Sequence, residues 1–540
     1  MTLRCDVSYW KSPQGGRQGR RARLTGHRAL ITRRTGLAAL AAGVLSANPA
    51  RAQPDPASRT LRVALSSPPG PLDPAAAAAP EQVAPVFGAY QQLVSPSGEP
   101  ELARSWDADT TGRVWTFEIA PGRRFSDGAP VDAAAVVFSL NRLARLGRGP
   151  ASDFVSFVDT VAAPSAMSVR LTLRQPTPRL LSILADRAAS IVNPSVAANA
   201  IGDDLGSGWL ATRTAGSGPY TLAPASSSGA FILVRNPYYT GVEPYFSRII
   251  FTVMADPTVR ALALKRAETD IALLMPAQAL KLLARDSGVR VVSQPAYAFQ
   301  NLAFNLARPV FKDPRLRQAV AHAIDTQAIV THIREGRASR FDGPLAPDML
   351  GARPGDWPFR YDPSKAAALA REAGRVQPVN VVMIYPGVSP ETDTVAQYIQ
   401  AMLAPLKLNV RLERLSTAAY LDRMDRGAYD LVLMGWVCSH SDPSAILDFW
   451  FEGEKAGVNN PARYSNQEVS ALLAAARSEL DTKRRAELHR AIIARVNADI
   501  PYVYLQQTHV STALRADIAG FSMDPARSID LPLLSMRRVS

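Results

Sequence analysis

The sequence contains very little cysteine and no long apolar run. Its 540 residues include only Cys5 and Cys438. Because Cys5 falls in an N-terminal segment that we expect to be cleaved, the mature chain should have no disulfide, which excludes the small secreted domains that depend on disulfides. No stretch of about 18 apolar residues occurs, so the sequence predicts no membrane-spanning helix.

Sequence patterns of catalysis are also absent. The chain has no Gly-x-Ser-x-Gly elbow, no phosphate-binding Walker sequence and no His-Glu-x-x-His helix. Residues 439–442 (Ser-His-Ser-Asp) contain the residue types of a hydrolase triad, but neighbours in one turn cannot form the required line of nucleophile, base and orienting acid. The sequence therefore predicts no catalytic residues and no cofactor. A periplasmic hydrolase of another type is the remaining enzymatic alternative.

Histidine is too dispersed to predict a metal site. A divalent cation needs three or four convergent ligands. The histidines beyond the N-terminal segment stand on separate predicted elements, so we expect no metal bound by protein side chains alone. They are His322, His332, His440, His489 and His509.

The positive charge is concentrated at the N-terminus. The chain has a net charge of +14, but residues 1–52 hold ten Lys or Arg and one Asp, which leaves only +5 for the rest. These residues contain Thr32-Arg33-Arg34, then a mildly apolar stretch, then a small-x-small site at 50–52. The pattern is typical of a twin-arginine signal peptide, with a general secretory signal as the alternative. Both routes lead to the periplasm, and a nucleic-acid partner loses its main support.

Beyond residue 59, short apolar strands alternate with helical patterns, which predicts α/β layers and more than one domain. Strands are expected at 61–65, 114–120, 168–174, 231–236, 248–254, 379–386, 408–415 and 429–436. Helices are expected at 313–336, 362–374, 390–406 and 466–499. Two of these helices open on Asp-Pro and end at Gly, which are favourable start and stop residues.

The stretch from Leu102 to Arg142 is the most distinctive. Within it, Val114 to Ala120 alternates apolar and polar residues like a half-buried strand, Asp127-Gly128 is a turn dipeptide, and Asp132 precedes an apolar run that it can cap. The order is therefore strand, turn and capped helix.

The whole stretch closely resembles the signature of the peptide/nickel (family 5) solute-binding proteins of ABC importers. Within that family, the chain is similar to the dipeptide- and oligopeptide-binding proteins. Further parts of the family pattern occur over most of the chain from about residue 60 to 520. They are Gly216-Ser217-Gly218-Pro219-Tyr220, Arg235-Asn236-Pro237, Asp270-Ile271-Ala272, Phe304-Asn305 and Ala323-Ile324-Asp325.

The resemblance implies an α/β fold of two lobes, the type II periplasmic-binding-protein fold (cluster C), with an extra inserted subdomain and a ligand cleft between the lobes. Residues 57–95, 215–297 and 505–540 would form lobe I, and residues 96–214 the inserted subdomain. Residues 298–504 would form lobe II.

The ligand is expected at Gly435 to Pro443, because this segment follows an apolar strand and open α/β sheets bind ligands at the carboxyl ends of strands. Relatives commonly have an Asp that pairs with a peptide's ammonium group, and this chain has Ser439 there, followed by His440. A free-amine peptide is therefore a weaker expectation. Asp442 can replace the missing charge or cap the next helix, and Trp436 can contact the ligand or pack in the core.

Other expected contacts come from aromatic and polar residues that fit an interlobe pocket. The strand at 296–305 corresponds to the family's crossover into lobe II, where Tyr297, Asn301 and Asn305 are candidates. Tyr90 and Tyr385 are additional candidates.

The sequence thus predicts a monomeric periplasmic binding component that captures a peptide or peptide-like molecule and delivers it to an ABC permease. Non-peptide ligands, namely an opine, a sugar conjugate or a metal-metallophore complex, are the alternatives. Delivery to a chemoreceptor would use the same fold.

Overall fold

The structure of the protein is a computed structural model of the 540-residue chain. It describes residues 59–76, 86, 88–147, 151–224, 230–283, 285–353, 355–438, 440–455, 457, 459–526 and 530–539. The predicted signal peptide at 1–52 and the predicted contact residue Ser439 lie outside the described residues.

The largest element is a mixed sheet of eleven strands within the described residues, in the order β13-β12-β14-β10-β15-β9-β1-β8-β7-β6, with β11 also paired to β15. The strands are β1 (Thr60–Leu65), β6 (Tyr220–Leu222), β7 (Ala230–Arg235), β8 (Arg248–Val253), β9 (Ile271–Ala272), β10 (Val289–Phe304), β11 (Ala338–Ser339), β12 (Val379–Pro386), β13 (Leu408–Leu415), β14 (Leu431–Val437) and β15 (Tyr502–Arg515). We call strands β1, β6, β7, β8 and β9 the β1 half of this sheet. We call strands β12, β13 and β14 the β12 half.

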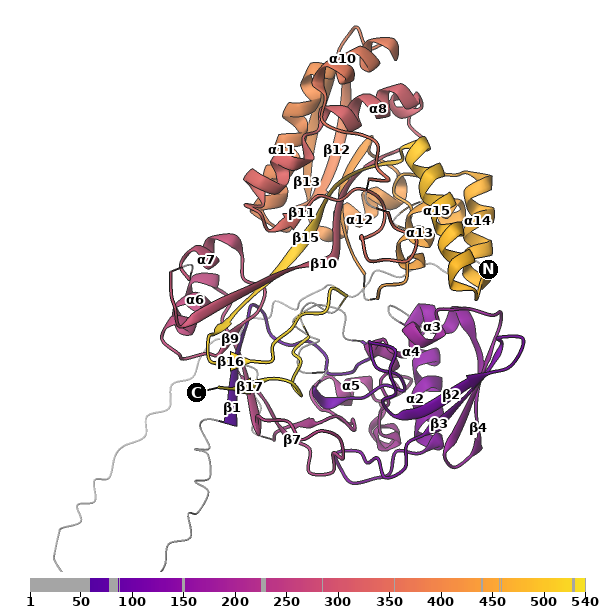
Figure 1. Cartoon of the computed structure of the whole chain (residues 1–540), viewed down its shortest axis with the longest axis vertical. Helices are drawn as coiled ribbons and strands as arrows, with labels where there is room; N and C mark the ends of the chain where they lie inside the picture. The colour runs from indigo at the N-terminus through magenta and orange to yellow at the C-terminus, as the bar shows by residue number, and fades with distance from the viewer. Residues whose placement is uncertain are drawn as a thin grey trace, which may run out of the picture. The chain divides into compact units, whose positions relative to one another are not determined.

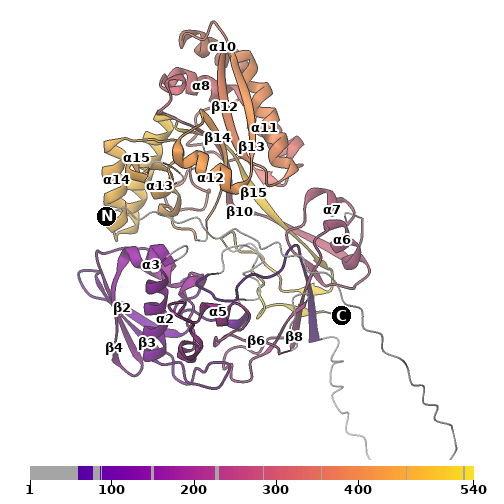
Figure 2. The same ribbon diagram turned by 180° about the vertical axis from the view of Figure 1, so that it is seen from behind.

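The long antiparallel strands β10 and β15 connect the two halves, and Figures 1 and 2 show them running side by side from the β12 half toward α6 and α7. Their pairing is interrupted between Pro295 and Phe299, where β10 bulges relative to β15. A bulge bends a strand and redirects its side chains. Tyr297 is therefore placed at the transition between the halves.

The β1 half is buried on both faces. Val63 and Ala64, which point to opposite faces of β1, belong to different apolar clusters. One face is covered by α6 (Pro257–Lys265) and α7 (Ala277–Lys281). A short ribbon of β16 (Ile518–Ala519) and β17 (Arg537–Arg538) packs beside the other.

The β12 half has its own large apolar core, formed with the helices that follow β10. These helices are α8 (Pro314–Ala323), α9 (Thr326–Ala328), α10 (Pro363–Glu372), α11 (Pro390–Leu403), α12 (Thr417–Arg426), α13 (Ser444–Phe451), α14 (Gln467–Ser478) and α15 (Thr482–Asp499). Asp313 and Asp362 cap α8 and α10, each just before a proline at the first helical position, as the sequence predicts.

A separate four-stranded sheet has the order β2-β3-β5-β4 and its own apolar cluster. Its strands are β2 (Ala103–Ala108), β3 (Val114–Ile119), β4 (Val158–Ser165) and β5 (Ser168–Leu173), and its helices are α2 (Ala133–Leu146), α3 (Ala151–Phe157), α4 (Leu180–Leu184) and α5 (Ser207–Leu210). We call this the four-stranded unit. Asp132 caps α2 through the Ala135 N–H, as predicted, and Phe125 is buried.

The Gly-Ser-Gly-Pro-Tyr motif at 216–220, which leads into β6, lies with its backbone directly against the backbone of residues 88–90. A Cβ atom on Gly216 would lie 2.0 Å from the Ala89 carbonyl oxygen, and one on Gly218 would lie 2.6 Å from the Ala89 carbonyl carbon. Glycine is needed at both positions because no other residue allows the two backbones to approach so closely.

The predicted strands are confirmed within one or two residues, except that the strand expected at 296–305 begins at Val289 and ends at Phe304. Two predicted helices are wrong in their continuity. The helix expected at 313–336 stops at Ile324, whose backbone is extended, and Asp325 caps a new short helix that continues into a π-helical turn at 329–333. The helix expected at 466–499 is interrupted at 479–481, because Asp481 caps α15 through the Arg484 N–H.

Candidate functional site

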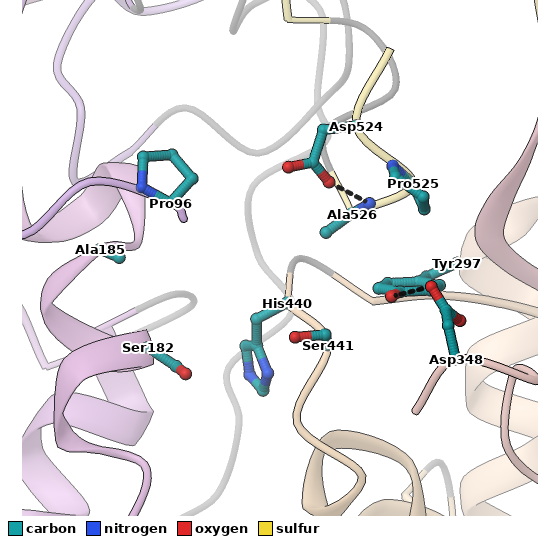
Figure 3. A pocket seen from close by; sticks show the side chains of 10 residues that line it. All are labelled: Pro96, Ser182, Ala185, Tyr297, Asp348, His440, Ser441, Asp524, Pro525 and Ala526. Atoms are coloured by element: carbon teal, nitrogen blue, oxygen red, sulfur yellow. Dashed lines mark hydrogen bonds between the residues drawn. The ribbon is translucent and has the colours of Figure 1, made fainter. Parts of the chain in front are cut away.

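A pocket of about 260 Å³ lies where the four-stranded unit, the β12 half and the C-terminal segment meet. In Figure 3, Ser182, Ala185 and Pro96 lie on one side and Tyr297 with Asp348 on the other, with His440 and Ser441 between them. Asp524, Pro525 and Ala526 complete the lining.

Tyr297 connects several parts of the pocket wall. Its backbone N–H donates to the Pro525 carbonyl (2.8 Å), and its carbonyl accepts from the Cys438 N–H (2.8 Å). Its hydroxyl donates to Asp348 Oδ2 (2.7 Å). Because Tyr297 lies in the bulge of β10, one residue is hydrogen-bonded to the C-terminal segment, to the end of β14 and to the loop that carries Asp348.

The wall beside Tyr297 is negatively charged. Burial raises the pKa of the Tyr297 hydroxyl, and the hydrogen bond to Asp348 and the charges of Asp348 and Asp524 raise it further. The hydroxyl therefore stays protonated and acts as a donor, while both carboxylates are exposed acceptors at this wall. Such a wall attracts a positively charged group of a solute, such as an ammonium group.

The loop between β14 and α13 is held by a buried ion pair. Both carboxylate oxygens of Asp442 accept from Arg485 of α15 at 2.8 Å, and one also accepts from the Ser444 N–H at 3.0 Å. Burial alone would raise the pKa of Asp442, but the positive charges of Arg485 and Arg179 outweigh it and hold that pKa far below its usual range. Asp442 is thus a permanently charged anchor of the loop.

The loop that carries Asp348 is anchored on the same helix. His489 lies one turn after Arg485 on α15, and its Nδ1 lies 3.0 Å from the Leu350 carbonyl, to which it can donate a hydrogen bond. Burial lowers the pKa of His489, and the nearby Arg485 lowers it further, which favours the neutral imidazole. Arg485 and His489 thus anchor, respectively, the loop between β14 and α13 and the loop that carries Asp348, and both loops line the pocket.

Two more predicted contact residues lie on β14. Gly435 is exposed and pairs with Gln300 of β10. The half-buried Trp436 packs on Phe449, with ring centroids 3.7 Å apart, and its indole N–H donates to the Cys438 sulfur at 3.1 Å. Burial raises the pKa of the Cys438 thiol to about 12, so this cysteine stays protonated.

The remaining predicted contacts are buried. Asn305 donates from its amide to two backbone carbonyls of the loop before β14, and the Tyr90 hydroxyl accepts from the Ala215 N–H. Asn301 and Tyr385 are also buried. Of the predicted residues, Tyr297 and His440 line the pocket described here. Ligand contact at each predicted position stays a prediction, because these placements do not test binding.

Sequence reasoning missed Ser182, Asp348 and Asp524. Each stands in a segment without a motif, and only the packing of distant parts of the chain brings them together. A carboxylate in a loop has no periodic pattern that would mark it as part of a pocket.

No group of three or more His, Cys, Asp or Glu side chains suited to a metal ion occurs among the residues that the structure describes. Among the same residues, no helix has both the length and the apolar character of a membrane span.

Comparison with known proteins agrees with this architecture. Residues 98–457 match the family described as "Bacterial extracellular solute-binding proteins, family 5 Middle". The chain belongs to this family. The family is one of solute-binding proteins.

The solute-binding protein is similar to the probable D,D-dipeptide-binding periplasmic protein DdpA of Escherichia coli (strain K12). The two are 32% identical over 477 residues, which cover 86% of this chain and 92% of that protein.

Two solved structures share its fold. HbpA2 from Haemophilus parasuis aligns with a TM-score of 0.81 and 22% identity, covering 89% of this chain and 100% of that one. DppA from Helicobacter pylori, in complex with the peptide STSA, aligns with a TM-score of 0.74 and 23% identity, covering 89% and 98%. The predicted α/β periplasmic-binding-protein fold is confirmed.

Proposed function

We propose that this protein binds a short peptide or peptide-like solute in the pocket beside Tyr297, with a positively charged group of the solute held by Asp348 and Asp524. The observation that carries the proposal is that two exposed carboxylates line one pocket, Asp348 hydrogen-bonded to the buried Tyr297 hydroxyl and Asp524 on the C-terminal segment. The similarity to a protein named as D,D-dipeptide-binding supports a dipeptide as the first candidate.

The charge arrangement supports recognition of a free amine. Hydrogen bonds to charged groups contribute about 1.5–3 kcal/mol, or roughly tenfold or more in affinity. Asp348 already accepts from Tyr297 through one oxygen, and Asp524 accepts from the Ala526 N–H through one oxygen. Each carboxylate therefore has lone pairs left for a ligand donor.

The protein would act in the periplasm as the soluble component of an ABC importer. The Arg33-Arg34 pattern in residues 1–52 supports export by the twin-arginine route, with a general secretory signal as the alternative. Solute binding between the parts predicted as lobe I (57–95, 215–297 and 505–540) and lobe II (298–504) would favour a closed form, which a monomer presents to the permease.

Calorimetric titration of the mature protein tests this proposal. We expect D-alanyl-D-alanine or L-alanyl-L-alanine to bind, and N-acetylation of the bound dipeptide to reduce its affinity at least about tenfold. Asp348→Asn and Asp524→Asn should each weaken binding of the free dipeptide by a similar factor, with little effect on the acetylated one.

Asp203→Asn is the matched control, because Asp203 is an exposed carboxylate of the four-stranded unit outside the pocket lining. Equal affinity for free and acetylated dipeptides would refute the amine assignment. Binding of an opine or a metal chelate in place of every dipeptide would instead favour the non-peptide alternative.

A further inference from the structure

A row of polar positions crosses three neighbouring strands of the large sheet. Gly435 of β14 lies opposite Gln300 of β10, and Gln300 lies opposite Gln506 of β15. Residues directly opposite one another carry their side chains on the same face of a sheet. Gln300 is 7% exposed and Gln506 is fully buried, and Gln506 Nε2 donates to Gln300 Oε1 at 2.6 Å. The row therefore contains two hydrogen-bonded amides beside a position without a side chain.

Arg334 is held on these two amides. Its Nε donates to Gln506 Oε1 at 3.0 Å, and its Nη2 donates to Gln300 Oε1 at 3.3 Å. Arg334 directly follows the π-helical turn at Ile329–Ile333, and its backbone N–H donates to the Ile329 carbonyl at 2.9 Å. Turns of this kind are frequent at functional sites. The guanidinium is therefore fixed in one place over β10 and β15.

The charge of Arg334 has no counterion in direct contact. Among the described residues, no carboxylate forms an ion pair with Arg334, whereas the buried Arg485 is paired with Asp442. Burial lowers the pKa of the Arg334 guanidinium, and the negative charge of Glu391 on α11 offsets this effect only in part. Because buried charges in proteins are normally paired, and two amide oxygens do not neutralise a cation, the position favours an added anion.

Donors and open space remain at this position. Arg334 Nη1 and Gln300 Nε2 have no acceptor among the residues that the structure describes. Gly435 is exposed, and a Cβ there would have, among described residues other than its chain neighbours, only the Phe299 carbonyl oxygen within 4 Å, at 3.7 Å. Two residues further on the same face, Val437 is 73% exposed. A guanidinium and an amide thus stand beside an uncovered end of β14, and a planar carboxylate accepts from such donors in pairs.

We propose that Arg334 and Gln300 form a carboxylate-recognition site at the end of β14, with Gly435 leaving its entrance open. The residues of this site are not among those that line the Tyr297 pocket, and the inference does not rest on the amine recognition proposed above. The carboxylate belongs either to the amine-bearing solute or to a separate organic anion, and the two sources give different results in titration.

Nuclear magnetic resonance of the mature protein, isotope-labelled at the arginine nitrogens, tests the site directly. The Nε–H signal of Arg334 is identified by its loss in Arg334→Lys. The probes are L-alanyl-L-alanine, which has an amine and a carboxylate, and N-acetyl-L-alanine, which has the carboxylate alone. We expect at least one of them to shift this signal saturably, and the C-terminal amide of that probe to bind at least about tenfold more weakly.

The two probes also identify the source of the carboxylate. A shift caused by the dipeptide alone assigns the carboxylate to the amine-bearing solute, and a shift caused by N-acetyl-L-alanine assigns it to a separate anion. If neither probe shifts the signal, or if acid and amide shift it equally, the inference is overturned. Loss of binding in Asp348→Asn or Asp524→Asn bears on the proposed amine site and not on this one.

Two variants separate recognition from folding, with calorimetric and urea titrations as the readouts. Gly435→Val places a β-branched side chain opposite Gln300 in a strand, so it should weaken binding of the carboxylate probe about tenfold without lowering the free energy of unfolding. Arg334→Gln removes the charge and should abolish the affinity difference between acid and amide.

Arg337→Gln is the matched control. Arg337 follows in the same loop, but its guanidinium is already paired with Glu335 at 2.9 Å, so its loss should leave the difference between acid and amide intact. A Gly435→Val protein that binds the acid as tightly as the wild type does, or an acid–amide difference that survives in Arg334→Gln, overturns the inference.

Discussion

The buried ion pair between Asp73 and Arg142 offers a direct test of how the four-stranded unit is attached. Asp73 is fully buried, and its two oxygens accept from Arg142 of α2 at 3.0 and 2.5 Å. Ser207 also donates to Asp73 at 2.8 Å. Replacing Arg142 by Met would leave a charged Asp73 without its cation in a site that water does not reach.

The expected loss follows from the cost of an unpaired buried charge. Breaking a buried ion pair by removing one partner costs about 3–5 kcal/mol, whereas removing both charges costs far less. Arg142→Met should therefore lower the free energy of unfolding by about 3–5 kcal/mol, and the double variant Asp73→Asn/Arg142→Met should recover at least about half of that loss.

Urea unfolding of the mature protein, followed by circular dichroism, measures both variants against the wild type. Arg170→Met, at an exposed arginine of β5 in the same unit, is the control and should change stability by less than about 0.5 kcal/mol. A decrease in the free energy of unfolding below about 1 kcal/mol in Arg142→Met, or a double variant as unstable as the single one, would refute the reasoning. The Asp73–Arg142 pair would then contribute little to the attachment of the four-stranded unit.

Two further predictions concern buried polar groups. Asn301 is fully buried, and neither end of its amide has a hydrogen-bond partner among the described residues. Asn301→Leu should therefore raise the free energy of unfolding, measured by urea titration, by about 1 kcal/mol. A lower free energy of unfolding, or a loss of dipeptide affinity, would instead show that the amide contacts water or the ligand. Because folding lowers the pKa of His489, its neutral form stabilises the native state, so stability should be full above the unfolded pKa of about 6.5 and decline as the pH falls through the lower folded value. His489→Gln should flatten this decline, and an unchanged pH profile would contradict the assignment.

Periodic patterns allowed most of the fold to be predicted. Strands such as Val379–Pro386 have the apolar and β-branched content of buried strands, and Asp-Pro pairs mark the starts of α8 and α10. The two helix interruptions were missed because helix formers stand on both sides of Asp325 and Asp481, although Asp itself favours an N-cap over a helix interior. Asp325 and Asp481 act as caps because the chain turns there to pack the next helix on the same core.

The candidate site could be predicted only where one strand carries it. Tyr297 was predicted because the family resemblance makes its strand the crossover between the lobes, and His440 because it follows an apolar strand; both line the pocket. Asp348 and Asp524 come from loops that reach the pocket through contacts with other elements, one with α15 and one with the bulge of β10. Such convergence depends on tertiary packing, which leaves no local trace in either loop.

Asp442 shows why the departure from the family pattern at Ser439 matters. Asp442 is the nearest carboxylate in the sequence, but both of its oxygens accept from Arg485 and one also accepts from Ser444, so little acceptor capacity remains. Diverting it to a ligand would leave the buried Arg485 without its anion, at a cost comparable to the expected gain. In the proposed function the negative charge for an ammonium group therefore comes from Asp348 and Asp524, whose carboxylates are exposed at the pocket.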